Sequence, residues 1–236
     1  MRIDILTLFP EMFTGVLSAS ILKRAQEKQL VSFHCHQLRD YTTDPHKKVD
    51  DRPFGGGPGM VLMCQPVIDA VTAIEKAAPE PATRILLAPT GQKLTQTLAE
   101  ELSKLPRILL IAGHYEGFDE RIHQLLAPRE ISIGDFILSG GELPAMVLLD
   151  AVVRLLPGVL GDNLSPHGES FAAADPTIAG GLEYPHYTRP RDFQGLSVPD
   201  ILLSGNHPAI EKWRAQQSKQ RTAERRPDLL GGKENG

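Results

Sequence analysis

The chain has 236 residues, of which 41% are hydrophobic and 23% are charged. This composition is typical of a folded globular protein and excludes a disordered, collagen-like or membrane-embedded chain. The length suits one large domain with a small appendage. The net charge of −4 and the pI of about 6.1 exclude a polycation, so any RNA contact must be local.

The N-terminal apolar run is interrupted by Asp4 and Pro10, which excludes a signal-peptide core and a transmembrane span. Cys35 and Cys64 are the only cysteines, too few for a disulfide framework or a four-cysteine metal site. We therefore expect a cytoplasmic protein in a reducing compartment.

Apolar segments of strand length alternate with helical patterns along the first 154 residues. The pattern predicts strands at residues 1–9, 31–38, 83–89, 107–113 and 130–138, and helices at 11–28, 92–104, near 120 and at 142–154. Such alternation predicts an α/β fold, in which a parallel sheet is flanked by helices.

A stretch rich in Gly, Ser, Pro, Asp and Ala separates this region from a polar C-terminal part. We expect a large α/β domain at 1–160, a flexible interdomain linker at 161–181 and a small all-helical domain at 182–236. Its second helix would be capped by Asn206, with Pro208 in the first turn.

Three glycine loops follow predicted strands, at residues 89–92, 113–117 and 133–144. Ligands of open parallel sheets bind at the carboxyl ends of strands, so the loops predict one pocket if they converge. Glu142 and Asp135 could then fix polar edges of the ligand. The competing interpretation is a set of tight turns in which glycine supplies positive φ.

The loop DDRPFGGGPGM resembles a nucleotide motif only superficially. It lacks Gly-Lys-Ser/Thr, and Met60 stands where a dinucleotide fingerprint needs glycine. Arg52 and Phe54 could stack on a base or simply form a turn. His34, Cys35 and His36 lie on alternating faces of a strand, so a structural role is favoured over a metal site.

The C-terminal helix places Arg214, Arg221 and Arg225 on one face. A solvated helix face is the simpler interpretation. The preceding segment, with Tyr187 and Arg189, interleaves aromatic and basic side chains in a way that suits bases and phosphates.

Six motifs, GGGPGM, LLAPTG, IAGHYEGFDER, SIGDFILSGGELPAM, DAVVRLLPGVLG and YPHYTRP, stand in order over most of the chain. Together they resemble the bacterial tRNA (guanine-N1)-methyltransferase family of the SPOUT class. The resemblance implies a C-terminal deep trefoil knot in the α/β domain, a homodimer with active sites at the subunit interface, and a tRNA substrate. It further implies methylation of the guanosine immediately 3′ of the anticodon, position 37, which preserves the reading frame in translation.

The same resemblance implies which residues act. The S-adenosyl-L-methionine pocket would use Pro89, Thr90, Gly91, Gly113, Tyr115, Glu116, Gly117, Ile133, Gly134, Asp135, Phe136, Ile137, Leu138, Gly140 and Gly141. Family members often have tyrosine where this chain has Phe136. Substrate would be bound by Arg52, Gly59, Tyr187, Arg189, Arg214 and Arg221, and a Mg²⁺ requirement is implied although the sequence shows no ligand set.

Two residues are implied in catalysis. Glu169 occupies the place of the family's aspartate as the general base that removes the N1 proton, with Asp175 and Asp162 as alternatives. Arg154 matches the family's arginine that stabilises charge on O6. Other interpretations are a different SPOUT enzyme and a catalytically inactive RNA-binding protein. A Rossmann-type oxidoreductase is disfavoured because this chain lacks the glycine fingerprint of that class.

Overall fold

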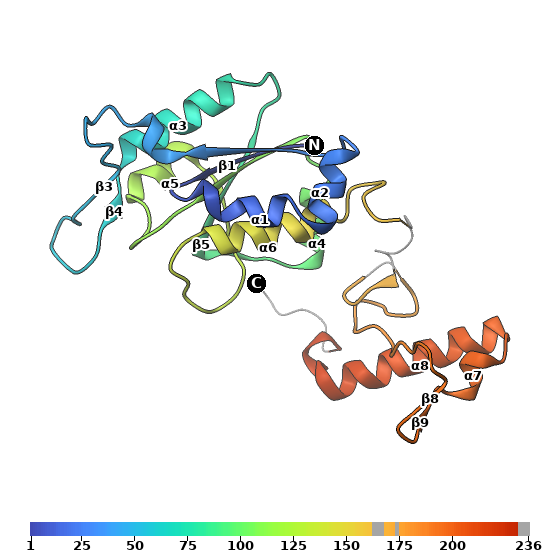
Figure 1. Ribbon diagram of the computed structural model, residues 1–236. Coiled ribbons are helices and arrows are strands. Elements are labelled where there is room, and N and C mark those ends of the chain that lie inside the picture. Colours follow the sequence, from blue (N-terminus) through green and yellow to red (C-terminus); the bar gives the residue numbers. More distant parts are fainter. Residues whose placement is uncertain (162–167, 173–174, 231–236) are drawn as a thin grey trace. The chain divides into compact units, whose positions relative to one another are not determined.

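Five parallel strands form the central sheet of the N-terminal part of the chain (Figure 1). The computed structural model describes residues 1–161, 168–172 and 175–230. The strand order is β2-β1-β6-β5-β7, and every neighbouring pair is parallel. The strands are β1 (Arg2–Thr7), β2 (Ser32–Gln37), β5 (Thr83–Lys93), β6 (Arg107–Ala112) and β7 (Arg129–Ser132). The predicted parallel α/β sheet is confirmed.

Helices cover both faces of this sheet, because alternate strand residues point to opposite sides. Ile3 and Ile5 pack in one core with α2 (Ser20–Glu27), α4 (Gln96–Leu102) and α6 (Glu142–Val153). Leu6 and Ile111 face the other core, formed with α3 (Cys64–Lys76) and α5 (Glu120–Leu126). Figure 1 shows these two helical layers on either side of the strands.

Several predicted elements are shorter than the sequence pattern suggested. The helix predicted at 92–104 is α4, at Gln96–Leu102, because β5 continues to Lys93. The single helix predicted at 11–28 is divided into η1 (Pro10–Phe13), α1 (Thr14–Leu17) and α2. Ser18 and Ala19 separate α1 from α2, whose first residue, Ser20, has a φ of +47°. The strand predicted at 130–138 ends at Ser132, because Gly134 has a φ of +150°, a conformation that side chains disfavour. The remaining residues, 133–141, form a loop.

A fully buried ion pair stabilises the interior of the sheet. Arg107 Nε donates to Asp4 Oδ2 over 3.0 Å, and its two terminal nitrogens donate to carbonyl oxygens at and beyond the C-terminal end of α3. Burial alone would raise the pKa of Asp4. Hydrogen bonds from His36, Arg2 and Arg107 outweigh it and hold this pKa well below its ordinary value.

Contacts divide the chain into two compact units, Met1–Gly161 and Asp162–Gly236. The second contains α7 (Asp200–Leu203), α8 (His207–Arg225) and the short helix η4 (Pro227–Leu229). The Asn206 side chain accepts a hydrogen bond from Ala209 N and caps α8. The prediction of an all-helical domain is wrong, because β8 (Asp192–Phe193) and β9 (Leu196–Ser197) pair as an antiparallel hairpin. Its turn uses positive φ at Gln194 and Gly195.

None of the helices in the described ranges is both long and apolar enough to cross a lipid bilayer.

Candidate functional site

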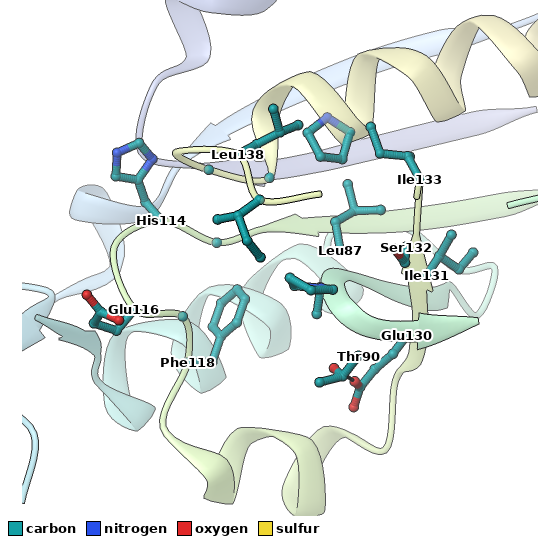
Figure 2. Close-up of a pocket in the computed structure, with 18 of the residues that line it drawn as sticks. Leu87, Thr90, His114, Glu116, Phe118, Glu130, Ile131, Ser132, Ile133 and Leu138 are labelled. Atoms are coloured by element: carbon teal, nitrogen blue, oxygen red, sulfur yellow. Dashed lines mark hydrogen bonds between the residues drawn. The ribbon is translucent and has the colours of Figure 1, made fainter. Parts of the chain in front are cut away.

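A cavity of about 580 Å³ opens at the carboxyl ends of β5, β6 and β7 (Figure 2). This volume falls within the range of pockets that enclose small organic ligands. The lining combines apolar side chains with the backbone of three loops. It comprises Leu87, Ala88, Pro89, Thr90, Gly113, His114, Tyr115, Glu116, Gly117, Phe118, Glu120, His123, Glu130, Ile131, Ser132, Ile133, Gly134, Phe136, Ile137, Leu138, Ser139, Gly140, Gly141 and Pro144.

The second and third glycine loops are bonded directly to each other. Gly141 N donates to Gly113 O over 2.7 Å, and His114 forms an isolated bridge with Gly140. A Cβ atom on Gly141 would lie 2.9 Å from Ala112 Cα and from Gly113 N, closer than such atoms approach in proteins. Glycine at 141 therefore permits the contact that closes this side of the cavity.

The first loop reaches the cavity through an irregularity in β5. The pairing of β5 with β7 shifts register between Leu87 and Gln92, and Pro89 and Thr90 lie in this bulge and line the cavity. Gly91 does not line it; a Cβ there would strike the backbone of Glu130 and Ile131. Its role is close packing of the two strands.

Left-handed backbone shapes the central loop. Tyr115 has a φ of +63° and Gly117 a φ of +106°. A non-glycine residue in this region costs on the order of 1 kcal/mol or more and persists where the surroundings enforce it. The conformation places Tyr115 and Glu116 along the cavity.

A polar group formed by Thr90, His123 and Glu130 lies at one side of the cavity, and Figure 2 shows Thr90 beside Glu130. Thr90 Oγ1 donates to Glu130 Oε2 over 2.8 Å, and His123 Nδ1 lies 2.5 Å from Glu130 Oε1. Burial would raise the pKa of Glu130, but these contacts lower it overall, so the carboxylate stays ionised.

The two acids expected to fix polar edges of a ligand do not line the cavity. Glu142, in the first turn of α6, is 1% exposed and lies beneath the loops. The Asp135 side chain is 84% exposed and forms an ion pair with Lys93 over 3.0 Å. Glu142 thus belongs to the interior of the protein, whereas Asp135 faces solvent.

The glycine-rich loop between β3 (Asp50–Asp51) and β4 (Val61–Leu62) borders the central loop of the cavity. Glu116 N donates to Met60 O over 3.0 Å, and a Cβ on Gly59 would lie 2.8 Å from the carboxyl carbon of Glu116. Arg52 is exposed and Phe54 is fully exposed. The structure thus brings Gly59 beside Glu116 of the cavity lining and leaves Arg52 and Phe54 facing solvent.

The two candidate catalytic residues lie in different units. Arg154 is the half-buried residue that ends α6, in the N-terminal unit. Glu169 is half-buried in the C-terminal unit, in a turn where its carbonyl accepts from Ala172 N. Asp175 accepts from Thr177 N with Oδ1 and so belongs to its own turn. Asp162 lies outside the described residues.

In the C-terminal unit the predicted basic face is partly occupied by contacts within the unit. The Arg214 guanidinium lies 4.7 Å from the centre of the Tyr184 ring, and Arg221 Nη1 donates to Glu183 O over 3.3 Å. Tyr187, Arg189 and Arg225 are exposed. The unit therefore presents an aromatic and basic surface in which two arginines are held by their own chain.

The histidines of β2 have structural partners. His36 Nε2 lies 2.9 Å from Asp4 Oδ1 and its Nδ1 lies 3.1 Å from the Tyr41 hydroxyl. The ring of His34 lies 3.3 Å from the Ser32 hydroxyl. In the part of the chain that the structure describes, no three His, Cys, Asp or Glu side chains cluster as metal ligands.

Sequence reasoning missed several residues that line the cavity: His114, Phe118, Glu120, His123, Glu130, Ser132, Ser139 and Pro144. His114 and Ser139 are adjacent to predicted residues, so their place in the same loops could have found them. His123 and Glu130 reach the cavity from α5 and β7, which no local motif indicated.

The fold and the site together define a parallel α/β protein with a pocket for a small organic ligand at the carboxyl ends of three strands. A family model described as "tRNA (Guanine-1)-methyltransferase TrmD" matches residues 1–232. The chain therefore belongs to this family of tRNA methyltransferases.

Individual relatives agree with this membership. A tRNA (guanine-N(1)-)-methyltransferase of Geobacillus kaustophilus is 59% identical over 230 residues, covering 98% of this chain and 91% of the relative. Its counterpart in Bacillus pumilus is 56% identical and covers 98% and 92%. That of Bacillus cereus strain AH820 is 53% identical over 234 residues and covers 99% and 93%.

Proposed function

We propose that this chain transfers a methyl group from S-adenosyl-L-methionine to N1 of the guanosine immediately 3′ of the anticodon of tRNA, position 37. The observation that carries the proposal is the convergence of three glycine loops on one cavity in a chain that the family model matches almost throughout. This methylation would preserve the reading frame during translation.

The cavity fits the methyl donor in size and in chemistry. Apolar side chains and exposed loop backbone suit an adenine ring, and the carboxyl groups of Glu116 and Glu130 suit hydroxyl and ammonium groups. When bound, the donor supplies an electrophilic methyl group on a sulfonium. The proposed contacts are Pro89, Thr90, Gly113, Tyr115, Glu116, Gly117, Ile133, Gly134, Phe136, Ile137, Leu138, Gly140 and Gly141, while Gly91 and Asp135 act from outside the lining.

The proposed general base is Glu169. Guanine N1 carries a proton and is weakly nucleophilic, so a carboxylate must accept that proton as the nitrogen attacks. Glu169 is half-buried in a defined turn next to Ser170, whose hydroxyl accepts a hydrogen bond from Glu183 N. Asp175, whose carboxylate accepts from Thr177 N, is the alternative candidate.

Arg154 is proposed to stabilise the negative charge that develops on O6 of the guanine. A guanidinium keeps its charge at any physiological pH and offers several donors in a fixed plane. Its position at the end of α6 gives it a rigid base, since α6 is buried along Ala145, Leu148 and Leu149. A preorganised cation of this kind lowers the barrier of the transfer.

The proposed tRNA-binding residues belong to two surfaces. Arg52 and Gly59 lie in the loop that borders the cavity, near the reacting base in this proposal. Tyr187 and Arg189 are exposed in the C-terminal unit, and Arg214 and Arg221 stand on α8. Exposed aromatic and basic side chains can bind bases and phosphates, so we propose that 182–236 is the tRNA-binding domain and 161–181 its linker.

We further propose a homodimer and a deep trefoil knot. An apolar patch lies on η1, α1 and the adjacent α6. It consists of four large side chains that are 37–48% exposed: Met12, Val16, Leu143 and Val147. Such an apolar patch favours a second copy of the chain as partner.

The return of the third loop onto Gly113 supports the knot.

The Mg²⁺ requirement rests on family resemblance alone. Mg²⁺ binds carboxylates together with several waters. The described residues contain no cluster of three His, Cys, Asp or Glu side chains that could hold the ion.

The test is methyl transfer from labelled S-adenosyl-L-methionine to two tRNA transcripts that differ only in guanine or adenine at position 37. Transfer to the guanine transcript alone supports enzyme, substrate and position together. Equal transfer to both would place the target elsewhere in the RNA, and absence of transfer with tRNA binding retained would indicate a binding protein.

A further inference from the structure

The most unusual polar contact of the N-terminal unit lies directly behind the cavity. The carboxylate of Glu142 is almost fully buried, and Thr7 Oγ1, at the end of β1, donates to its Oε1 over 2.8 Å. Burying a carboxylate is costly unless its oxygens receive hydrogen bonds. The second oxygen, Oε2, faces the imidazole of His114.

On the side that faces Glu142, the Nδ1 atom of His114 has no hydrogen-bond partner in the described part of the chain. Nδ1 lies 3.5 Å from Glu142 Oε2, yet among the described residues it is one of two buried side-chain nitrogen or oxygen atoms without a hydrogen-bond partner. Buried polar atoms rarely stay unpartnered, and hydrogen bonds of an active site are often long before the ligand binds. A shift of about 0.5 Å would make this contact a normal hydrogen bond.

Glycine at 140 makes the pair possible. A Cβ on Gly140 would collide with both Glu142 Oε2 and His114 Nδ1. His114 lines the cavity and its side chain is 23% exposed, although Nδ1 is buried. The edge of the ring that a ligand in the cavity can reach is therefore the one that carries Nε2.

A carboxylate opposite Nδ1 determines which ring nitrogen carries the proton. An ionised carboxylate only accepts hydrogen bonds, so Nδ1 must be the donor, and in the neutral ring Nε2 is then an acceptor. The rings of Phe9 and Tyr115, with centroids 5.0 and 5.1 Å from that of His114, limit its rotation.

We propose that Glu142 is a positioning residue of the donor pocket: it holds His114 in the Nδ1–H form, so that Nε2 accepts a hydrogen bond from an N–H or O–H group of the bound nucleoside. The inference rests on the proposed binding of S-adenosyl-L-methionine in this cavity. Glu142 itself does not contact the ligand. His114 contributes to specificity because its Nε2 accepts a hydrogen bond only from a ligand with a donor group at that place.

The form of the imidazole can be observed directly. Long-range ¹H–¹⁵N spectra of histidine-labelled protein, with the His114 signals identified by their loss in His114→Gln, should show the Nδ1–H form in the presence of S-adenosyl-L-methionine. In Glu142→Gln this preference should disappear. An Nε2–H form or a doubly protonated ring in the wild-type complex at pH 8 overturns the proposal.

Two substitutions of His114 separate its two nitrogens. The amide of asparagine lies near the place of Nδ1, and that of glutamine near the place of Nε2. We expect His114→Asn to weaken S-adenosyl-L-methionine binding about tenfold, as loss of one hydrogen bond does, and His114→Gln to retain most of the affinity. Equal losses or the reverse order contradict a contact through Nε2.

Kinetics distinguishes positioning from a general loss of structure. Glu142→Gln and Thr7→Val should raise the KM for the donor while kcat at saturating donor is kept, and Thr7→Ser, which retains the hydroxyl, should restore the KM. Glu27→Gln, at an exposed surface pair with Lys23, is the matched control. A fall in kcat with unchanged KM overturns the proposal, whereas failure of the wild-type protein to bind the donor would refute the proposed function itself.

Discussion

At the scale of single residues, buried charges are tied to each other rather than to solvent. Asp4 receives hydrogen bonds from Arg2, His36 and Arg107, and Arg107 is itself completely buried. Removing one partner of such a pair leaves a buried charge without compensation. The network therefore makes the start of the sheet depend on a single carboxylate.

Asp4→Ala is expected to lower the free energy of unfolding by about 3–5 kcal/mol, the usual effect of breaking a buried ion pair. Denaturant unfolding followed by circular dichroism measures it. Asp51→Ala, which removes an exposed pair with Lys48, is the control and should change stability much less, because solvent screens exposed ion pairs. Similar effects of the two substitutions would contradict the role of Asp4.

The same carboxylate gives a pH dependence of defined sign. The pKa of Asp4 is lowered in the folded chain, so its stabilisation is complete above the unfolded value of about 3.9 and is lost as the pH falls below it. We expect the Tm of the wild-type protein to fall more steeply between pH 5 and pH 3 than that of Asp4→Asn. Parallel pH profiles would show that Asp4 contributes nothing to this loss.

Arg154 and Glu169 make separate contributions to turnover in the proposed mechanism. Arg154→Ala should lower kcat about 10²-fold or more through loss of a donor to O6, and Glu169→Ala about 10²- to 10⁴-fold through loss of the base. Single-turnover methyl transfer measures both, and donor affinity should not change. Near-normal turnover in either variant would remove that residue from the mechanism.

At the scale of elements, the strands and most helices of the N-terminal unit follow from apolar periodicity, but their ends do not. The strand expected at 130–138 stops at Ser132, two residues before the positive φ of Gly134. Most of the residues that follow line the cavity, a tertiary effect that periodicity cannot detect. Helix α3 was not predicted although Val67, Ala70, Val71 and Ile74 mark its buried face. The hairpin at 192–197 is too short to give a pattern.

Residues 89–92 were expected to form a loop at a strand end but lie within β5. The second and third glycine loops were predictable from sequence as loops at strand ends. Their mutual contact was not, because Gly113 and Gly141 are distant in the chain and only the folded sheet brings them together. For the same reason no local sequence pattern indicated that His123 and Glu130 line the cavity or that Glu142 is buried.

Gly141→Ala tests this contact between loops. The added methyl group would lie 2.9 Å from Ala112 Cα, so the loops must separate, and we expect donor binding to weaken about tenfold or more. Isothermal titration calorimetry measures the affinity. Gly161→Ala, where a methyl group meets open space, is the control. Unchanged binding in Gly141→Ala would show that the loops can yield without affecting the pocket.

At the scale of the whole molecule, the proposed base and the proposed cation belong to separate compact units. In the proposed homodimer, an active site takes Arg154 from one subunit and Glu169 from the other. The apolar patch on α1 and α6 would provide the interface.

Mixed dimers test the shared site. Chains carrying Arg154→Ala and chains carrying Glu169→Ala, each inactive alone, should regain about a quarter of wild-type activity after refolding together, since half the dimers are mixed and half of their sites are intact. Methyl transfer to tRNA is the readout. Absence of recovery, with mixed dimers shown by mass spectrometry, would place both residues of a site in one chain.

The bond between Gly141 N and Gly113 O also has a thermodynamic consequence. It joins residues that are far apart in sequence, so an unfolded or half-folded chain has no cavity to offer, and a ligand of the cavity binds the native state only. At a concentration one hundred times its Kd, such a ligand stabilises the native state by about 2.7 kcal/mol. If the cavity binds the methyl donor as proposed, the bound donor would lower the fraction of unfolded chain that a protease can attack.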